Sequence, residues 1–128
     1  MHEPYETRLK RLHDFRVTYR FYSELEGGRK TGTPYQGYRC DFSFENFGTE
    51  DFNLYMIWPE FEDESGNVIT EDETHVPKEG TARMWIISEG MRPYHKEKII
   101  PGMKGFMMEG HHKTGEYQVI EINGLREP

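Results

Sequence analysis

The sequence lacks the features that would mark a disulfide-stapled, membrane-spanning or secreted protein. It has one cysteine, Cys40, among 128 residues, which excludes an internal disulfide and favours a reducing compartment. No stretch approaches the roughly 20 consecutive apolar residues that a membrane helix needs. The charged N-terminus has no apolar segment of the kind found in a secretory signal. We therefore expect a cytoplasmic protein with no membrane partner.

Nucleotide-binding and metal-binding motifs are also missing. The chain has no Gly-Xaa-Xaa-Xaa-Xaa-Gly-Lys-Ser/Thr loop to cradle phosphates and no Walker-type aspartate segment. No cysteine or histidine stands at a recognised zinc spacing, and no catalytic constellation is evident. The sequence therefore predicts a protein that is not an enzyme, with no nucleotide cofactor and no bound metal.

Apolar residues are few, and the charge is unevenly distributed. Hydrophobic residues make up 34% of the chain, but aromatic residues reach 14% and bury large areas per side chain, so one domain with a modest core is expected. The net charge is −7, and residues 41–80 carry twelve acidic groups against one basic group. A protein that neutralises phosphates needs a basic face. The total therefore disfavours nucleic acid, although the flanking segments leave room for a local basic surface.

Alternating side chains predict a β-sheet. Residues 15–22 alternate apolar and polar side chains, which is typical of a strand with one apolar face. The Gly27-Gly28 turn follows, and the alternation resumes over residues 38–45, with Cys40 facing inward. Further strands are predicted over residues 52–58, ended by Pro59, and over residues 81–88, 104–109 and 116–122. About six strands with little helix indicate an all-β barrel or sandwich with antiparallel pairing.

The chain divides into three predicted parts. Residues 1–14 form an arm or a short helix, because Tyr5, Leu9 and Leu12 fall on one helical face. Residues 15–123 form the β-barrel domain, and residues 124–128 form a C-terminal tail.

Two segments resemble a known family. Gly27-Gly28-Arg29-Lys30-Thr31, then Gly37-Tyr38-Arg39 and Phe42-Ser43-Phe44, resembles the Gly-Gly-Arg-X-Thr and Gly-Tyr-Arg-Pro-Gln-Phe-X-Phe run of elongation factor Tu. That run opens the third domain of the factor, its C-terminal β-barrel. Residues 102–110 are similar to the family's Gly-Leu-Arg-Phe-Ala-Ile-Arg-Glu-Gly. The resemblance covers residues 15–122 and implies a six-stranded antiparallel Greek-key β-barrel standing alone, without the GTPase domain.

The resemblance also nominates a binding surface. In the family this barrel contacts the T-stem backbone of aminoacyl-tRNA, whereas Asp41 and Glu45 here put carboxylates where the family has Gln and often Arg. We therefore expect a non-enzymatic binding module that engages a protein partner, with tRNA as the less favoured ligand, through loops 26–39 and 109–115. The candidate RNA- or partner-binding residues are Arg29, Lys30, Arg39, Glu109, Gly110, His112 and Lys113.

Two other functions stay open from the sequence. The acidic stretch 60–73 could meet a basic partner, as an immunity or antitoxin protein does. A small metal-dependent hydrolase could be built on His95, His111 and His112, although adjacent histidines on a strand point to opposite faces.

Three residues are expected to serve packing alone. Cys40 alternates with inward aromatic residues and should be buried and unreactive. Trp58 and Trp85 are expected in the core.

Overall fold

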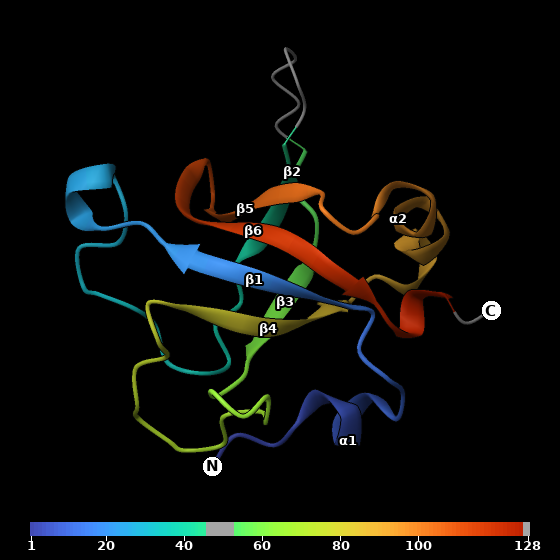
Figure 1. Ribbon diagram of the computed structural model, residues 1–128, viewed down its shortest axis with the longest axis horizontal. Coiled ribbons are helices and arrows are strands. Elements are labelled where there is room, and N and C mark those ends of the chain that lie inside the picture. The colour runs from blue at the N-terminus through green and yellow to red at the C-terminus, as the bar shows by residue number, and fades with distance from the viewer. Residues whose placement is uncertain (46–52, 127–128) are drawn as a thin grey trace.

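A computed structural model describes residues 1–45 and 53–126 (Figure 1), and these residues are mostly β-structure. Six antiparallel strands form one sheet in the order β2-β5-β6-β1-β4-β3. Among the described residues, none of the helices is long and apolar enough to cross a membrane. The strands are β1 (Phe15–Phe21), β2 (Asp41–Phe44), β3 (Ile57–Phe61), β4 (Glu79–Ile86), β5 (Lys104–Glu109) and β6 (His112–Ile122); the helices are α1 (Tyr5–Leu9) and α2 (Arg92–Lys98), with 3-10 turns η1 (Glu24–Glu26), η2 (Glu89–Met91) and η3 (Gly124–Arg126).

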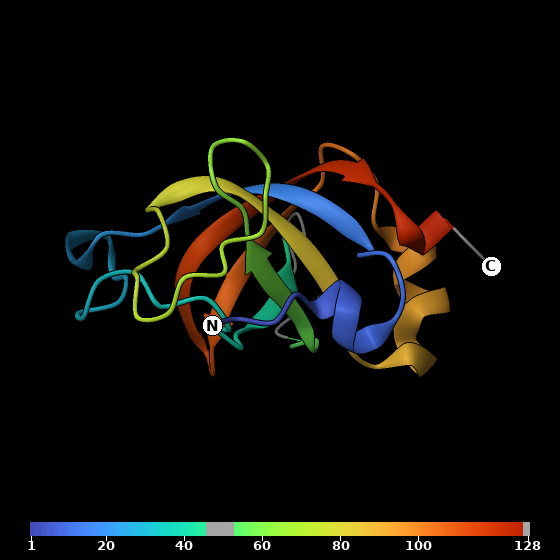
Figure 2. The same ribbon diagram turned by 90° about the horizontal axis from the view of Figure 1, so that it is seen from below.

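The sheet is curled into a half-barrel. Figure 2 shows β1, β4 and β6 arching over β2 and β3. Two β-bulges in β6 accompany the bend: the pairing with β1 skips Ile120, and the pairing with β5 skips Thr114. The edge strand β2 meets the segment before β3 at one bridge, where Phe42 and Tyr55 exchange two backbone hydrogen bonds of 2.9 Å.

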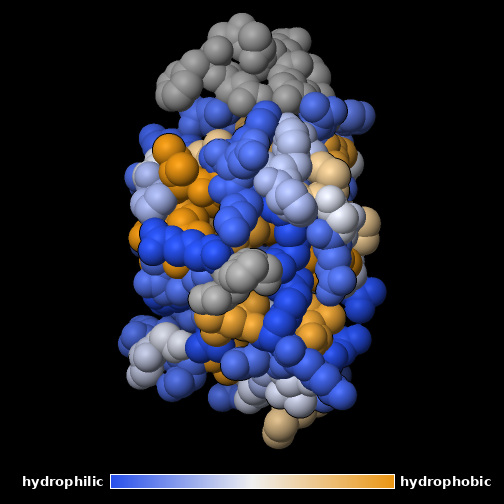
Figure 3. Space-filling model, turned by 90° about the vertical axis from the view of Figure 1, so that its right-hand side faces the viewer, coloured by the Kyte–Doolittle hydropathy of each residue, from blue (hydrophilic) through white to orange (hydrophobic). Residues whose placement is uncertain are grey.

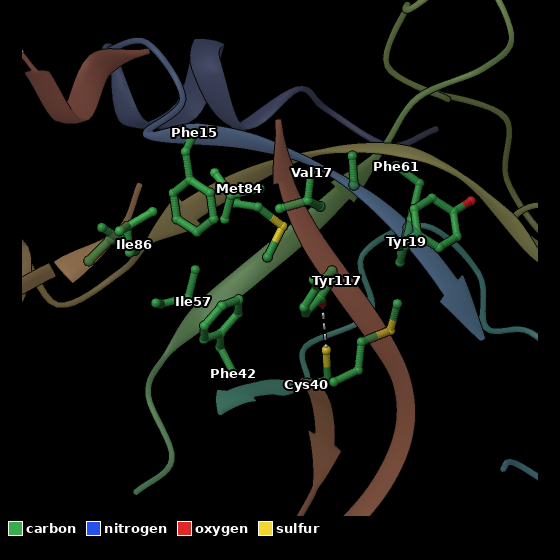
Figure 4. Packing of buried hydrophobic residues seen from close by; sticks show 14 of the residues in the cluster. Phe15, Val17, Tyr19, Cys40, Phe42, Ile57, Phe61, Met84, Ile86 and Tyr117 are labelled. Carbon is green, nitrogen blue, oxygen red and sulfur yellow. Dashed lines mark hydrogen bonds between the residues drawn. The ribbon is translucent and has the colours of Figure 1, made fainter. Parts of the chain in front are cut away.

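The hydrophobic core lies inside the curve (Figure 4). Alternate residues of β1 are buried, because successive side chains of a strand point to opposite faces of the sheet. The ring of Phe42 stacks on Tyr117 with centroids 5.4 Å apart, and Cys40 lies beside the Tyr117 hydroxyl at 3.6 Å. The alternation in the sequence therefore predicted correctly which face of β1 is buried, and Cys40 is buried as expected.

The predicted end of the third strand at Pro59 is wrong. Pro59 lies inside β3, opposite Met84 of β4. Phe61, two residues later, points its amide the same way, away from β4, and donates it to the side chain of Gln36 at 2.8 Å. The missing N–H of Pro59 therefore falls on the free edge of the sheet, where proline is tolerated.

The last two strands form a tighter hairpin than the sequence suggested. Residues 111–115 were expected as a loop, but β6 already begins at His112, which pairs with Glu109. Only Gly110 and His111 form the turn, and Gly110 adopts a φ of 61°.

Helix α2 was not predicted. Proline usually interrupts a helix, yet Pro93 lies in the first turn of α2. Proline is compatible with that position, since the first amides of a helix have no partner within it. The helix covers one end of the core with His95.

The N-terminal arm forms a second layer on the outer face of the sheet. Trp85 is 0% exposed but lies under this arm, against Tyr5 and His13, and not in the main core. Its indole N–H donates to Glu60, whose carboxylate also accepts the Tyr5 amide at 2.8 Å. Trp85 is therefore buried as expected, although outside the main core. Trp58 is only half-buried, so the prediction of a core position is wrong for Trp58.

Candidate binding surface

The Gly27-Gly28 turn is dictated by backbone geometry. Gly27 has a φ of 92°, which favours glycine, and its amide caps η1. A Cβ atom on Gly28 would lie 2.1 Å from the Tyr22 carbonyl oxygen, so no other residue fits there without movement. Ser23 and Glu26 form a capping box at the start of η1. The turn therefore sets the direction in which the next residue, Arg29, leaves the sheet.

Arg29 clamps this loop to the β5–β6 hairpin. Its Nη1 donates to Glu109 at 2.6 Å, and its Nε donates to the Gly32 carbonyl at 2.9 Å. Its Nη2 lies 3.4 Å from the Thr31 hydroxyl, and the guanidinium stacks over the Tyr38 ring at 5.1 Å. Each nitrogen of Arg29 is thus engaged within the protein. The side chain holds the loop in place and has little capacity left for a ligand phosphate.

Glu109 is the second half of the clamp. It accepts a hydrogen bond from the Tyr38 hydroxyl as well as from Arg29, and Tyr38 in turn lies 3.0 Å from the hydroxyl of the buried Thr114. Partial burial raises the pKa of Glu109, but the hydrogen bonds from Tyr38 and Arg29 outweigh it and hold that pKa below its ordinary value. Glu109 is therefore an ionised structural partner near neutral pH.

A shallow groove runs between the loop and the hairpin. The described residues lining it include Glu24, Lys30, Glu109 and His112, and the ring of His112 donates from Nε2 to the Gly27 carbonyl. The structure thus brings four predicted site residues together: Arg29, Lys30, Glu109 and His112. Gly110 forms the adjacent turn.

Two predicted site residues point elsewhere. Arg39 stacks over Trp58 at 4.6 Å, on the outer face of the sheet. Lys113 lies over the Phe106 ring at 4.0 Å. Neither lines the groove, because a one-residue step along a strand or hairpin turns a side chain to the opposite face.

Sequence reasoning missed two residues at this end of the molecule. Leu25, on η1, is 101% exposed, an apolar side chain between two glutamates. Lys78 lines a second hollow, which shares Arg29 and Lys30 with the groove. Both leave a signal in the sequence: Leu25 stands alone among carboxylates, and Lys78 is the single basic residue in the acidic segment 41–80.

The opposite end of the molecule, around α2, also exposes apolar side chains. Met56, Tyr94 and Ile100 are exposed there, but hydrophilic residues divide the hydrophobic surface into separate patches (Figure 3). Scattered apolar side chains of this kind are normal on a protein surface.

The three histidines of the hydrolase hypothesis are not brought together. His95 is 1% exposed and packs against Phe44 and Tyr55, and burial lowers its pKa to about 4. His112 lies in the groove on the hairpin. Across residues 1–45 and 53–126, no group of three or more His, Cys, Asp or Glu side chains is placed to hold a metal ion.

Burial also explains the state of Cys40. Desolvation raises the pKa of its thiol to about 12, so the reactive thiolate is scarce near neutral pH.

The acidic stretch 60–73 is only partly exposed. Glu60 and Glu62 are buried on the outer face, where Glu62 accepts hydrogen bonds from Arg16 and Arg83. Burial alone would raise the pKa of Glu62, but these arginines lower it. The stretch therefore offers a basic partner fewer charges than its sequence suggests.

The sequence matches no protein-family model, and it has no significant match among curated proteins.

Proposed function

We propose that this protein is a non-enzymatic binding module that engages a protein partner through the surface made by residues 22–33 and 109–112. The observation that carries the proposal is the clamp between Arg29 and Glu109, which joins two loops into one fixed surface. A surface that is ordered before binding loses less conformational entropy when a partner docks.

Leu25 supplies an apolar anchor beside the groove. Its turn is held by the Ser23–Glu26 capping box and by an ion pair between Arg20 and Glu26 of 2.9 Å. The side chain is therefore fully exposed on a backbone that cannot easily fold it inward. An exposed leucine alone would mean little; on a fixed turn beside a groove it is suited to enter a pocket on another protein.

The same surface suits tRNA less well. Arg29 is paired with Glu109, and Glu24 also lines the groove, so a phosphate backbone would meet carboxylates there. Binding to phosphates requires unpaired cations arranged along a face. A protein partner is accordingly preferred to RNA.

We propose in addition that the curled sheet is a variant of the Greek-key barrel of elongation factor Tu. The sequence resemblance over residues 27–44 and 102–110 supports this relation, and so does the Phe42–Tyr55 bridge between the two sheet edges. An experimental structure would test it: pairing of the edges beyond this bridge would support a closed barrel, and well-separated edges would contradict it.

The binding proposal is tested by affinity purification from cells of the source organism. We expect a protein partner to co-purify with the wild-type chain and to be lost with Leu25→Asp. The control is Ile100→Asp, which changes an exposed side chain on the α2 side. Identical partners with and without Leu25→Asp would contradict the proposal, as would a bound species that nuclease removes.

A further inference from the structure

We propose that the hollow beside Lys30 and Lys78 binds a carboxylate-bearing segment of the protein partner. The inference rests on the proposed function and names the chemistry of the partner at that surface. The hollow adjoins the groove, because Glu24, Arg29 and Lys30 line both.

Two lysine side chains give this hollow its charge. Lys30 and Lys78 are both exposed, and neither forms an ion pair with any described residue. Glu24 is the one carboxylate among the described lining residues, and Arg29 is already neutralised by Glu109. The balance of free charge is therefore positive, in a chain whose net charge is −7.

Most of the other lysine and arginine side chains already contact a carboxylate or an aromatic ring. The arginines of the sheet pair with carboxylates, as Arg83 does with Glu62. Other cations lie over aromatic rings, as Lys113 does over Phe106. Two unpaired ammonium groups therefore meet at one hollow, on a surface where most of the other cations already have a partner.

The walls of the hollow are fixed in place. Thr33 donates from its hydroxyl to the Val76 carbonyl at 2.6 Å, which joins the loop to the segment before Lys78. Phe21 donates its amide to the Lys78 carbonyl at 2.8 Å. The backbones that carry Lys30 and Lys78 are therefore held relative to each other, and a carboxylate between them would meet a preformed site.

The size of the positive site favours an acidic peptide over RNA. Two lysines match one or two carboxylates, whereas a nucleic acid needs cations along several successive phosphates. Leu25 follows Glu24 directly, so a segment that combines acidic and apolar side chains would contact both features. The structure thus points to an acidic, partly apolar segment.

The test is an NMR titration of the isotope-labelled full chain with three probes. They are a short synthetic peptide that alternates glutamate with leucine and serine, its glutamine counterpart, and an oligouridylate of equal length. We expect the glutamate peptide to shift the amides of residues 22–33 and 78 and to bind severalfold more tightly than the glutamine peptide. We expect Lys30→Glu/Lys78→Glu to weaken it by about tenfold, through loss of attraction and added repulsion. The matched control Lys10→Glu/Lys96→Glu, on the side of α1 and α2, should change affinity less than about twofold.

Three outcomes would overturn the inference: no shifts with the glutamate peptide, equal binding of both peptides, or no effect of Lys30→Glu/Lys78→Glu. Tighter binding of the oligouridylate at these amides would show that the partner class is wrong. The failure of this inference can be told from failure of the proposed function. If Leu25→Asp abolishes co-purification of the partner and Lys30→Glu/Lys78→Glu does not, the binding surface stands and the acidic partner does not.

Discussion

At the scale of single residues, Arg29 was predicted to bind a ligand, but in the structure it joins two loops of the protein. Its guanidinium joins Glu109, Gly32 and Tyr38 across loops that are 80 residues apart in the chain. An ion pair that is partly exposed contributes modestly, but here it also carries hydrogen bonds and a cation–π contact. We therefore expect the contacts of Arg29 to order the loop more than they raise the free energy of unfolding of the whole protein.

Replacing Arg29 by alanine should loosen both loops. We expect Arg29→Ala to lower the free energy of unfolding by about 1 kcal/mol, because the pair with Glu109 is partly exposed. Hydrogen exchange measured by mass spectrometry should quicken in residues 29–32 and 109–112 together. The control Arg126→Ala removes an exposed cation and should leave exchange unchanged. Faster exchange in only one of the two segments would show that Arg29 does not couple them.

His95 should make the protein sensitive to acid. Burial lowers its pKa in the folded state from an ordinary 6.5 to about 4, and its Nδ1 has no partner. The unfolded chain therefore binds this proton first, and stability is full above the unfolded pKa and falls as pH drops from there towards the folded pKa. We expect a loss of about 2 kcal/mol by about pH 5 from this residue alone.

The measurement is urea unfolding of the wild type and His95→Phe at about pH 7.5 and about pH 5. Phenylalanine keeps the ring contacts with Phe44 and Tyr55 and removes the titration. The loss of stability between the two pH values should shrink by about 2 kcal/mol in the variant. An unchanged loss would contradict the assignment to His95, and His13, whose pKa burial also lowers, would then be examined by the same comparison.

At the scale of elements, the sequence predicted strands well where alternation decides burial. β1 follows its pattern because one face meets the core and the other meets the outer layer. The pattern failed where tertiary contacts override local preference: Pro59 is accepted at the free edge of β3, and Pro93 lies in the first turn of α2. A local reading treats both prolines as breaks, because only the neighbours of each proline show that its missing N–H has no role.

The side chain of Gln36 forms hydrogen bonds with the edge of β3 that a neighbouring strand would otherwise form. Its amide donates to the carbonyls of Phe61 and Ile69 at 2.8 and 2.9 Å, and its oxygen accepts the Phe61 N–H at 2.8 Å. Free strand edges invite pairing with other chains, and covering them prevents it. The side chain of Gln36 and the ring of Pro59 together protect this edge.

Removing the Gln36 side chain should destabilise and expose this edge. We expect Gln36→Ala to lower the free energy of unfolding by about 2 kcal/mol, because the Phe61 amide and the Ile69 carbonyl lose their hydrogen-bond partner. Light scattering during thermal unfolding should also show aggregation at a lower temperature. The control is Gln118→Ala on the exposed face of β6, for which a change below about 0.5 kcal/mol is expected. Equal effects of the two substitutions would contradict the role of Gln36.

At the scale of the whole molecule, the sequence predicted which segments form the candidate surface but not which of their side chains meet. The glycine turn and the last hairpin were both named, because their motifs are local. The partnership of Arg29 with Glu109, and the meeting of Lys30 with Lys78, depend on sheet order, which no short segment contains. Figure 1 shows why: η1 and the β5–β6 hairpin come from distant parts of the chain and reach the same end of the sheet.

Charge is also organised at this scale. The carboxylates of Glu60 and Glu62 are buried on the outer face of the sheet, where the Trp85 indole N–H donates to Glu60 and Arg16 pairs with Glu62. Counting charges along residues 41–80 therefore overstates the acidity that a partner meets. The positive charge of the hollow at Lys30 and Lys78 can be recognised only when the charges that pair within the protein are left out of the net charge.

The most direct test of the central claim is photo-cross-linking from both loops of the surface. A photoreactive amino acid is placed at Leu25, at His111 or, as a control, at Ile100, and cells of the source organism are irradiated. The account predicts that positions 25 and 111 capture the same protein and that position 100 does not. Capture of different proteins from the two loops, or of the same protein from all three positions, would contradict a single binding surface at this end of the molecule.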